Sequence, residues 1–480
     1  MKHAAALLAL LATACSTMEP RFERPDAAIP ASWPVGDPYV VTAEAGLPAL
    51  TYKQVFQDPR LQTLISQGIA NNRDLMTAAA NIAAAREQFR IQRSQQFPRL
   101  DAGASANVTG DKDQFETGVS VPSFEVDLFG RLRSLTHAQQ ERYFATEAGA
   151  RATRLALVAD IASAWLDYAA DSSLLLIAQE TVSSAEKSVR LTRARLEGGI
   201  APRTDLRQAE QILSQAQADL AQQRTARAQD VNALQLLVGS PVAPTLLPAS
   251  IDEAFGSVAP VQAGLDSYVL LRRPDVLQAE YQLRAANANI GAARAALFPR
   301  ITLTGLLGLA SSALGKLFTG GAFGWSVGGD ATYTVFQAGA GRANVRLSEA
   351  QRNAAIATYQ GTIQTAFREV SDALARRGTI KDEIGARQRQ RAATADTYLL
   401  TEARYNAGID PYLNVLSAQQ SYYSAQRILV QTKLTAARNI VDTYRAIGGD
   451  ALLQATPICQ PLPGDSNASN AKLASQCSPI

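Results

Sequence analysis

Histidine is almost absent from this chain, which has only His3 and His137 among 480 residues. The chain therefore has almost no histidines with which to form a metal site or a catalytic dyad that depends on imidazole. The sequence also lacks a Gly-rich phosphate loop, an HExxH and a GxSxG, which mark nucleotide sites, zinc peptidases and serine hydrolases. Carboxylates alone could support an enzyme, but no arrangement of them points to one. We expect that the protein is not an enzyme and that it binds neither a cofactor nor a metal ion.

Charged and aromatic residues are also few, at 19% and 6% of the chain. The charged share lies below the usual quarter. The net charge of +3 gives no electrostatic support for binding nucleic acid. The hydrophobic share of 47% is sufficient for a substantial core. A chain of this length could form two to four ordinary domains or one structure built from internal repeats.

Residues 1–14 read as a secretory signal: a basic start, a short apolar run and small residues before a cut, too short to span a bilayer. The stretch "LATACS" places Cys15 at the cut and resembles the lipobox of bacterial lipoproteins, although Ala12 stands where Leu is usual. We expect Cys15 to be lipidated, with residues 15–50 forming an extended segment. The alternative is an ordinary signal peptide with an incidental cysteine.

The other two cysteines, Cys459 and Cys477, lie in a C-terminal tail, 450–480, that contains proline and asparagine. An isolated pair in an exported protein favours a disulfide. The tail offers no partners for a catalytic or metal role.

The order of motifs in the chain occurs twice. "NNRDL" at 71–75 matches "RRPDV" at 272–276, and "FPRL" at 97–100 matches "FPRI" at 298–301. The stretch "GGIAPRTDL" at 198–206 returns as "AGIDPYLNV" at 407–415. Such self-similarity indicates a duplication. We predict one repeat over 51–245, a Pro-rich linker over 246–261 and a second repeat over 262–449.

Each repeat is expected to contain one β-hairpin, about 100–129 and about 300–336. Apolar residues alternate there with polar or small ones, the period of strands with two unlike faces. In the first repeat Pro122 interrupts the alternation. Phe115, Thr117, Val119 and Val121 alternate before it, and Phe124, Val126 and Leu128 resume on the other parity.

A very long helix should follow each hairpin. The chain has no proline between Gly130 and Gly198, and none between Pro299 and Pro411. A helix of about 60 residues would be roughly 90 Å long. Shorter helices, about 59–94 and 274–296, precede the hairpins, and return helices are expected at about 204–237 and 413–447.

The two repeated loops are expected to be the turns where the long helices reverse. Gly199 and Gly408 can end one helix as C-caps, and Thr204 or Asp205 can cap the next. Four strands cannot close a barrel, and open sheet edges are not tolerated in lipid. Three chains would supply twelve strands, an even number found in outer-membrane barrels. The alternative is a small soluble sheet.

The sequence resembles those of the TolC-like outer-membrane efflux factors, and most of all those of their OprM/NodT-type lipoprotein branch. The resemblance is carried by "ACS", "MEPRFERP", "FQDPRLQTLISQGIANNRDL", "FEVDLFGRLR" and the two turns. It implies a mainly α fold with a membrane β part: a duplicated helix–β-hairpin–helix, a long α-helical barrel and a shared 12-stranded transmembrane β-barrel in a homotrimer. It also implies a lipid-anchored place in the outer membrane, with a periplasmic adaptor and an inner-membrane resistance-nodulation-division (RND) pump as partners.

From the resemblance and their location, the turns are the expected adaptor-docking tips, with these residues in contact: Gly199, Thr204, Asp205, Gly408, Leu413 and Asn414. The family often has acidic residues where this chain has Asn414 and Ser417. Asp205 and Asp410 remain to supply charge at the entrance, or are simply solvated or capping aspartates.

The expected function is the passive exit duct of a tripartite efflux pump for small molecules such as drugs. A protein-secreting duct of type I secretion shares the fold, but its members usually lack a lipobox. A non-porous, lipid-anchored coiled-coil scaffold would explain the helices but leaves the two alternating hairpins without a role.

Overall fold

The computed structural model describes residues 17–34, 36–39, 51–109, 113–261 and 267–449. The chain divides into two compact units. The first comprises residues up to Ala27, 79–149 and 275–362, and the second comprises 28–78, 150–274 and 363 onward. Each unit therefore draws on both repeats, because equivalent segments of a duplicated chain pack together.

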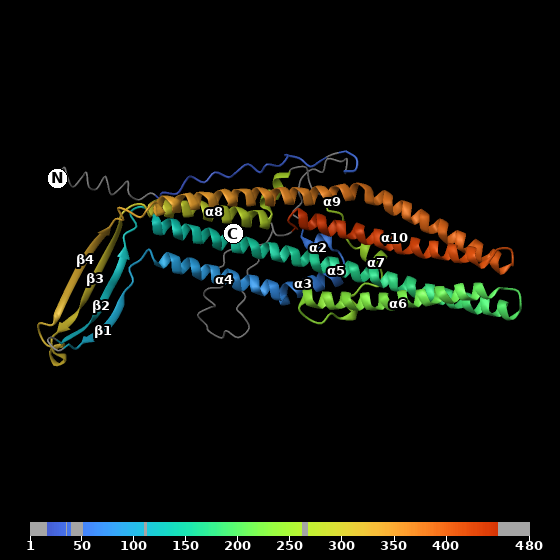
Figure 1. The fold of residues 1–480 in the computed structure, drawn as a ribbon, viewed down its shortest axis with the longest axis horizontal. Coiled ribbons are helices and arrows are strands. Elements are labelled where there is room, and N and C mark those ends of the chain that lie inside the picture. Colours follow the sequence, from blue (N-terminus) through green and yellow to red (C-terminus); the bar gives the residue numbers. More distant parts are fainter. Residues whose placement is uncertain (1–16, 35, 40–50, 110–112, 262–266, 450–480) are drawn as a thin grey trace. The chain divides into compact units, whose positions relative to one another are not determined.

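The first unit contains one antiparallel sheet with the strand order β1-β2-β3-β4 (Figure 1). Its strands are β1 (Asp101–Asn107), β2 (Gln114–Glu125), β3 (Arg300–Ser311) and β4 (Phe323–Thr332). Each repeat supplies one hairpin, and β2 pairs with β3 across the repeats. The prediction of one hairpin in each repeat is confirmed. Within the described chain, the outer edges of β1 and β4 have no strand partner.

The pairing of β2 with β3 shifts register between Val121 and Phe124. Pro122 lies in this interval and has no N–H to donate to the ladder. Val121 lies opposite Gly305, and Phe124 lies opposite Leu303, so β2 has one extra residue there. The bulge returns Phe124 to the face of Val121, which confirms the change of parity predicted at Pro122.

Two helices of 67 residues dominate the fold, α5 (Arg131–Glu197) and α9 (Ala340–Asn406). Their return helices are α6 (Arg203–Val238) and α10 (Tyr412–Ala446). The remaining elements are α2 (Tyr52–Val55), α3 (Pro59–Asn71), α4 (Arg73–Ser94), η1 (Pro244–Leu246), α7 (Ile251–Phe255), η2 (Ser267–Arg272), α8 (Pro274–Ala295) and η3 (Leu314–Lys316). The expected succession of helix, hairpin, long helix and return helix is confirmed in both repeats.

The helix expected over 59–94 is in fact two helices. Asn72 has extended backbone angles and separates α3 from α4. Its side-chain Oδ1 accepts the N–H of Leu75 at 3.0 Å, and its Nδ2 donates to the carbonyl of Leu237 at 2.9 Å. The amide thus caps the new helix and ties the break to the end of α6, a tertiary bond that local sequence does not reveal.

The core of the second unit is built on α5. Ile161, Trp165 and Leu166 are fully buried, and the Trp165 Nε1–H donates to the carbonyl of Leu246 at 3.0 Å. Among the described helices, α5 alone is long and apolar enough to cross a membrane, but 56% of its most apolar window is buried within the chain. We therefore read α5 as a core helix.

In the first unit, the N-terminal segment lies along α8. The Asn287 side-chain amide donates to the carbonyl of Pro20 at 2.8 Å, and Arg24 pairs with Glu280 at 2.9 Å. Gly291 leaves room for Glu19, because a Cβ there would lie 2.4 Å from the Glu19 Cγ. The helix that leads into β3 thus holds the start of the described chain.

Candidate functional site: the helical turns and the sheet faces

Both helix-reversing turns have the same backbone geometry. Gly199 and Gly408 lie in the left-handed region, with φ of +72° and +75°. The N–H of Ile200 bonds the carbonyl of Arg195 at 3.0 Å, and the N–H of Ile409 bonds that of Arg404 at 2.9 Å. These six-residue closures are Schellman motifs, in which glycine fits because it carries no Cβ. The sequence thus predicted the two C-caps.

The N-caps differ from the expectation. Pro202 and Pro411 occupy the N-cap positions of α6 and α10, with extended angles and no side-chain cap. Thr204 and Asp205 lie two and three positions beyond the N-cap and so cannot cap, because α6 already begins at Arg203. Proline presets the extended entry into the helix, so a side-chain cap is not required to define it.

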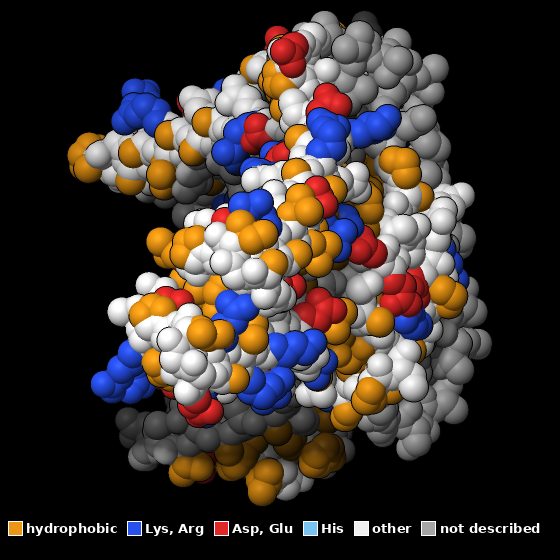
Figure 2. All heavy atoms as spheres, turned by 90° about the vertical axis from the view of Figure 1, so that its right-hand side faces the viewer, with side chains coloured by type: hydrophobic (Ala, Val, Ile, Leu, Met, Phe, Trp, Pro, Cys, Tyr) orange, Lys and Arg blue, Asp and Glu red, His pale blue; other side chains and the backbone are white. Residues whose placement is uncertain are grey.

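The expected tip residues other than the two glycines lie in the first turns of the return helices α6 and α10. Thr204, Leu413 and Asn414 are exposed, and Asp205 is half-buried. Figure 2, which faces this end, shows Lys and Arg side chains interspersed with hydrophobic ones. Together with the two glycines, these residues form an accessible surface at the ends of the two hairpins.

A buried apolar cluster joins the two hairpins beside their turns. It contains Val189, Leu206, Ala209, Tyr405, Tyr412 and Val415. The Arg195 guanidinium lies 4.3 Å from the centre of the Tyr405 ring, and its Nη2 donates to the carbonyl of Asn406 at 2.9 Å. Sequence reasoning missed Tyr405 and Tyr412, although their places on either side of the second turn were a signal. The cluster holds the tip of the first repeat against that of the second.

The two candidate entrance aspartates have different surroundings. Asp410 forms a two-point pair with Arg404, at 2.6 Å and 3.1 Å, and this hydrogen-bonded pairing lowers the pKa of Asp410 below its usual range. In the described chain, no Lys or Arg lies within ion-pair distance of Asp205. Asp205 is therefore the stronger candidate for an uncompensated charge at the tips.

The sheet has one charged and one apolar face. Residues paired across strands share a face, and so do alternate residues along a strand. By this register all five charged residues of the strands lie on one face: Asp101, Glu116, Glu125, Arg300 and Asp330. The opposite face presents exposed Leu303, Leu307, Trp325 and Val327. Water on one side and lipid on the other would satisfy both faces.

Ion pairs join the sheet to α5. Glu125 accepts two bonds from Arg131, at 2.8 Å and 2.7 Å, and the Arg133 backbone N–H donates to Asp127 at 2.8 Å. Gly130, with φ of +75°, makes the turn between these partners. The spacing of "EVDLFGRLR" is thus explained by two acid–base pairs that close across one glycine.

Three expected sites, Cys15, Cys459 and Cys477, lie outside the described residues. In the described part of the chain, no group of three or more His, Cys, Asp or Glu side chains is arranged to hold a metal ion.

Comparisons with known proteins agree with this geometry. The solvent efflux pump outer membrane protein SrpC of Pseudomonas putida is 40% identical over 463 residues, which cover 92% of this chain and 97% of SrpC. Outer membrane protein OprJ of Pseudomonas aeruginosa is 38% identical over 457 residues, covering 93% of this chain and 95% of OprJ. The open state of the Neisseria gonorrhoeae MtrE outer membrane channel superposes with a TM-score of 0.82 at 33% identity, over 91% of this chain and 99% of MtrE.

The family described as outer membrane efflux protein matches residues 64–240 and 266–449, which are most of the two repeats. This is a family of outer-membrane channels and not of enzymes. The structural neighbours place this chain in the outer membrane, with the TolC-like combination of long helices and a β-barrel strand set. From its sequence and its structure, the chain belongs to the outer membrane efflux protein family.

Proposed function

We propose that three copies of this chain form the exit duct of a tripartite efflux pump, with a periplasmic adaptor at the helical turns and an RND pump in the inner membrane. The observation that carries the proposal is the four-stranded sheet, with all its charges on one face and free edges on β1 and β4.

A sheet of this kind must be closed by other copies. Unpaired N–H and C=O groups at an edge are too costly in lipid. Joining β4 of one copy to β1 of the next removes every edge when the ring closes, and three copies give twelve strands. The charged faces then line the lumen, and the apolar faces meet lipid. The duct itself performs no chemistry.

Small organic molecules are the proposed cargo. Curated relatives are named solvent, toluene or antibiotic efflux pump outer membrane proteins, and none of these names refers to protein secretion. We further propose the adaptor contact at Gly199, Thr204, Asp205, Gly408, Leu413 and Asn414, because these residues lie at the accessible ends of the hairpins. Lipidation at Cys15 and a disulfide between Cys459 and Cys477 complete the proposal.

The first test is the mass of the protein extracted from outer membranes in mild detergent, corrected for bound detergent and lipid. We expect a trimer that forms channels in planar bilayers. A monomer or dimer without channel activity would contradict barrel closure by three chains. The cargo is tested separately: deletion of the gene should sensitise cells to toluene or antibiotics, whereas an unchanged sensitivity with impaired protein export would favour a secretion duct.

A further inference from the structure

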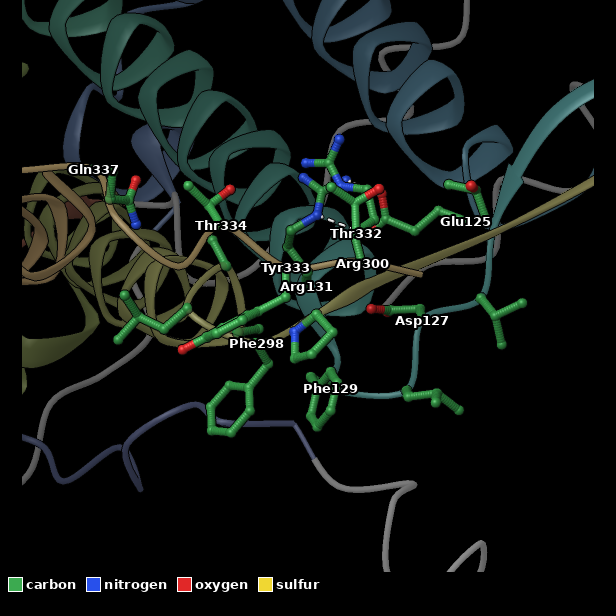
Figure 3. A pocket seen from close by; sticks show the side chains of 17 residues that line it. Glu125, Asp127, Phe129, Arg131, Phe298, Arg300, Thr332, Tyr333, Thr334 and Gln337 are labelled. Carbon is green, nitrogen blue, oxygen red and sulfur yellow. Dashed lines mark hydrogen bonds and ion pairs between the residues drawn. The ribbon is translucent and has the colours of Figure 1, made fainter. Parts of the chain in front are cut away.

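A cavity of about 450 Å³ lies in the first unit, where the strands meet the helices (Figure 3). Three connections form it: β2 to α5, α8 to β3, and β4 to α9. Its volume falls within the range of small-molecule sites. The strand residues that line it, Glu125, Arg300, Thr302 and Thr332, all lie on the charged face of the sheet. The cavity is therefore accessible from the side of the sheet that we assign to the lumen.

The lining holds two arginines and two carboxylates, but one of these carboxylates is paired with an arginine outside the lining. Glu125 accepts hydrogen bonds from Nε and Nη2 of Arg131, and its Oε2 also lies 3.3 Å from the Nε of Arg300. Two arginines thus share one carboxylate. The second acid of the lining, Asp127, is paired with Arg133. The Arg300 side chain is 58% exposed and retains N–H donors for a further partner.

The rest of the lining suits a flat solute with an anionic end. Figure 3 shows Phe129 and Phe298 apart from the group formed by Arg131, Arg300 and Glu125. The two phenyl rings stack with centroids 4.7 Å apart. Thr334 and Gln337 add side-chain donors to the lining, whereas the hydroxyl of Thr332 donates to Asp330. An arginine recognises a carboxylate through two parallel hydrogen bonds, and aromatic side chains favour the ring that carries it.

We propose that this cavity is a solute subsite of the duct, which binds small aromatic carboxylates through Arg300 while Phe129 and Phe298 contact the ring. The proposal rests on the proposed function for the source of the solute. The other charge near Arg300 on the same face is Asp330, which accepts a bond from Thr332 at 2.6 Å and forms no ion pair with Arg300 among the described residues. Arg300 is also the only basic residue in the four strands.

The test is saturation-transfer NMR on the full protein in nanodiscs, with 2-naphthoate as the probe and the neutral 2-naphthamide as its matched control. Empty nanodiscs give the background. We expect saturable binding of naphthoate at least several-fold stronger than that of naphthamide. Arg300→Gln should weaken naphthoate binding about tenfold, since it removes a charge-assisted hydrogen bond, and Arg300→Lys should give an intermediate value.

Glu125→Gln supplies an opposite expectation. It removes the carboxylate that competes for both arginines, so naphthoate should bind more tightly, whereas a merely structural role would weaken binding in both variants. Equal binding of naphthoate and naphthamide, or unchanged binding in Arg300→Gln, would overturn the proposal. If Arg300→Gln fails to assemble, the proposal is tested by naphthoate binding to Arg300→Lys, which should be weaker than that of the wild type, and to Glu125→Gln, which should be tighter. The trimer mass and channel activity are measured on the same samples, so a failed subsite is distinguishable from a failed duct.

Discussion

Arg195 and Tyr405 come from different repeats, yet the guanidinium of one lies 4.3 Å from the ring centre of the other. The equivalent of Arg195 in the second repeat is Arg404, which pairs instead with Asp410. The position that corresponds to Asp410 in the first repeat, 410 − 209 = 201, is Ala201. The first turn therefore has no carboxylate at the position equivalent to Asp410, and Arg195 reaches across to the second hairpin. The two repeats thus differ at this position, with a local ion pair in the second turn and a contact between hairpins from the first.

Removing the bridge should separate the tips. Tyr405 is 4% exposed, and truncation of a buried aromatic side chain generally costs about 3–5 kcal/mol. We expect Tyr405→Ala to weaken the contact between the hairpins and to increase the open time of single channels in planar bilayers. Leu413→Ala, at an exposed position of α10, is the control, and its open time should match that of the wild type because the planar bilayer contains no adaptor for Leu413 to contact. Identical open times in the two variants would show that the cluster does not hold the tips together.

The tip glycines should be necessary for export but not for assembly. A β-branched side chain at the left-handed positions of Gly199 and Gly408 is strained by about 1–2 kcal/mol at each site and distorts the turn. The double variant Gly199→Val/Gly408→Val should form trimers and lose drug export, measured as drug susceptibility of complemented cells. Gly361→Val is the matched control, because Gly361 lies within α9 and a Cβ added there would meet no heavy atom within 4 Å. Normal export by the double variant would refute the tip assignment.

Patterns that repeat along the chain predicted most of the fold. Period-two alternation predicted the four strands and the change of parity at Pro122, which the structure shows as a bulge because proline has no N–H for the ladder. The absence of proline after Gly130 gave the long helix α5. In both turns a glycine is followed by an isoleucine and, two positions later, a proline. This pattern predicted both helix reversals, because such turns are set by local backbone preference.

Contacts between distant residues were not predictable in the same way. The break at Asn72 depends on a bond to Leu237, which lies on a different helix. The cap positions of Pro202 and Pro411 depend on how the chain enters the return helices, and their side chains give no cap signal. The cluster around Tyr405 joins residues about two hundred positions apart, so one repeat alone does not show it.

The two faces of β4 should respond differently to charge. Val327 lies on the apolar face and Ser326 on the charged face. A lysine that faces lipid near the middle of a barrel costs about 2–4 kcal/mol, whereas a lumen position tolerates it. We expect Val327→Lys to reduce the amount of trimer in outer membranes, measured by fractionation and heat-modifiable gel migration, and Ser326→Lys to leave it near normal. The reverse order would mean that the lipid and lumen faces are exchanged.

The N-terminal segment should be released at high pH. His137 lies between Glu19, at 2.9 Å, and Glu141, at 3.3 Å. The bond to Glu141 and then the bond to Glu19 raise the pKa of His137 to about 10 from its usual value of 6.5. Because the folded pKa is the higher one, the stabilisation is complete below about pH 6.5 and is lost as the pH rises through about 10.

We therefore expect hydrogen exchange in residues 17–27, normalised for the intrinsic pH dependence of exchange, to accelerate between pH 7.5 and pH 10.5. His137→Gln removes the titrating group, so its exchange should be faster at pH 7.5 and show no further acceleration after the same normalisation. The side chain of His137 is 46% exposed, so solvent screening reduces the energy involved, and the informative quantity is the difference between the two proteins. An equal acceleration in both would show that another group controls the segment.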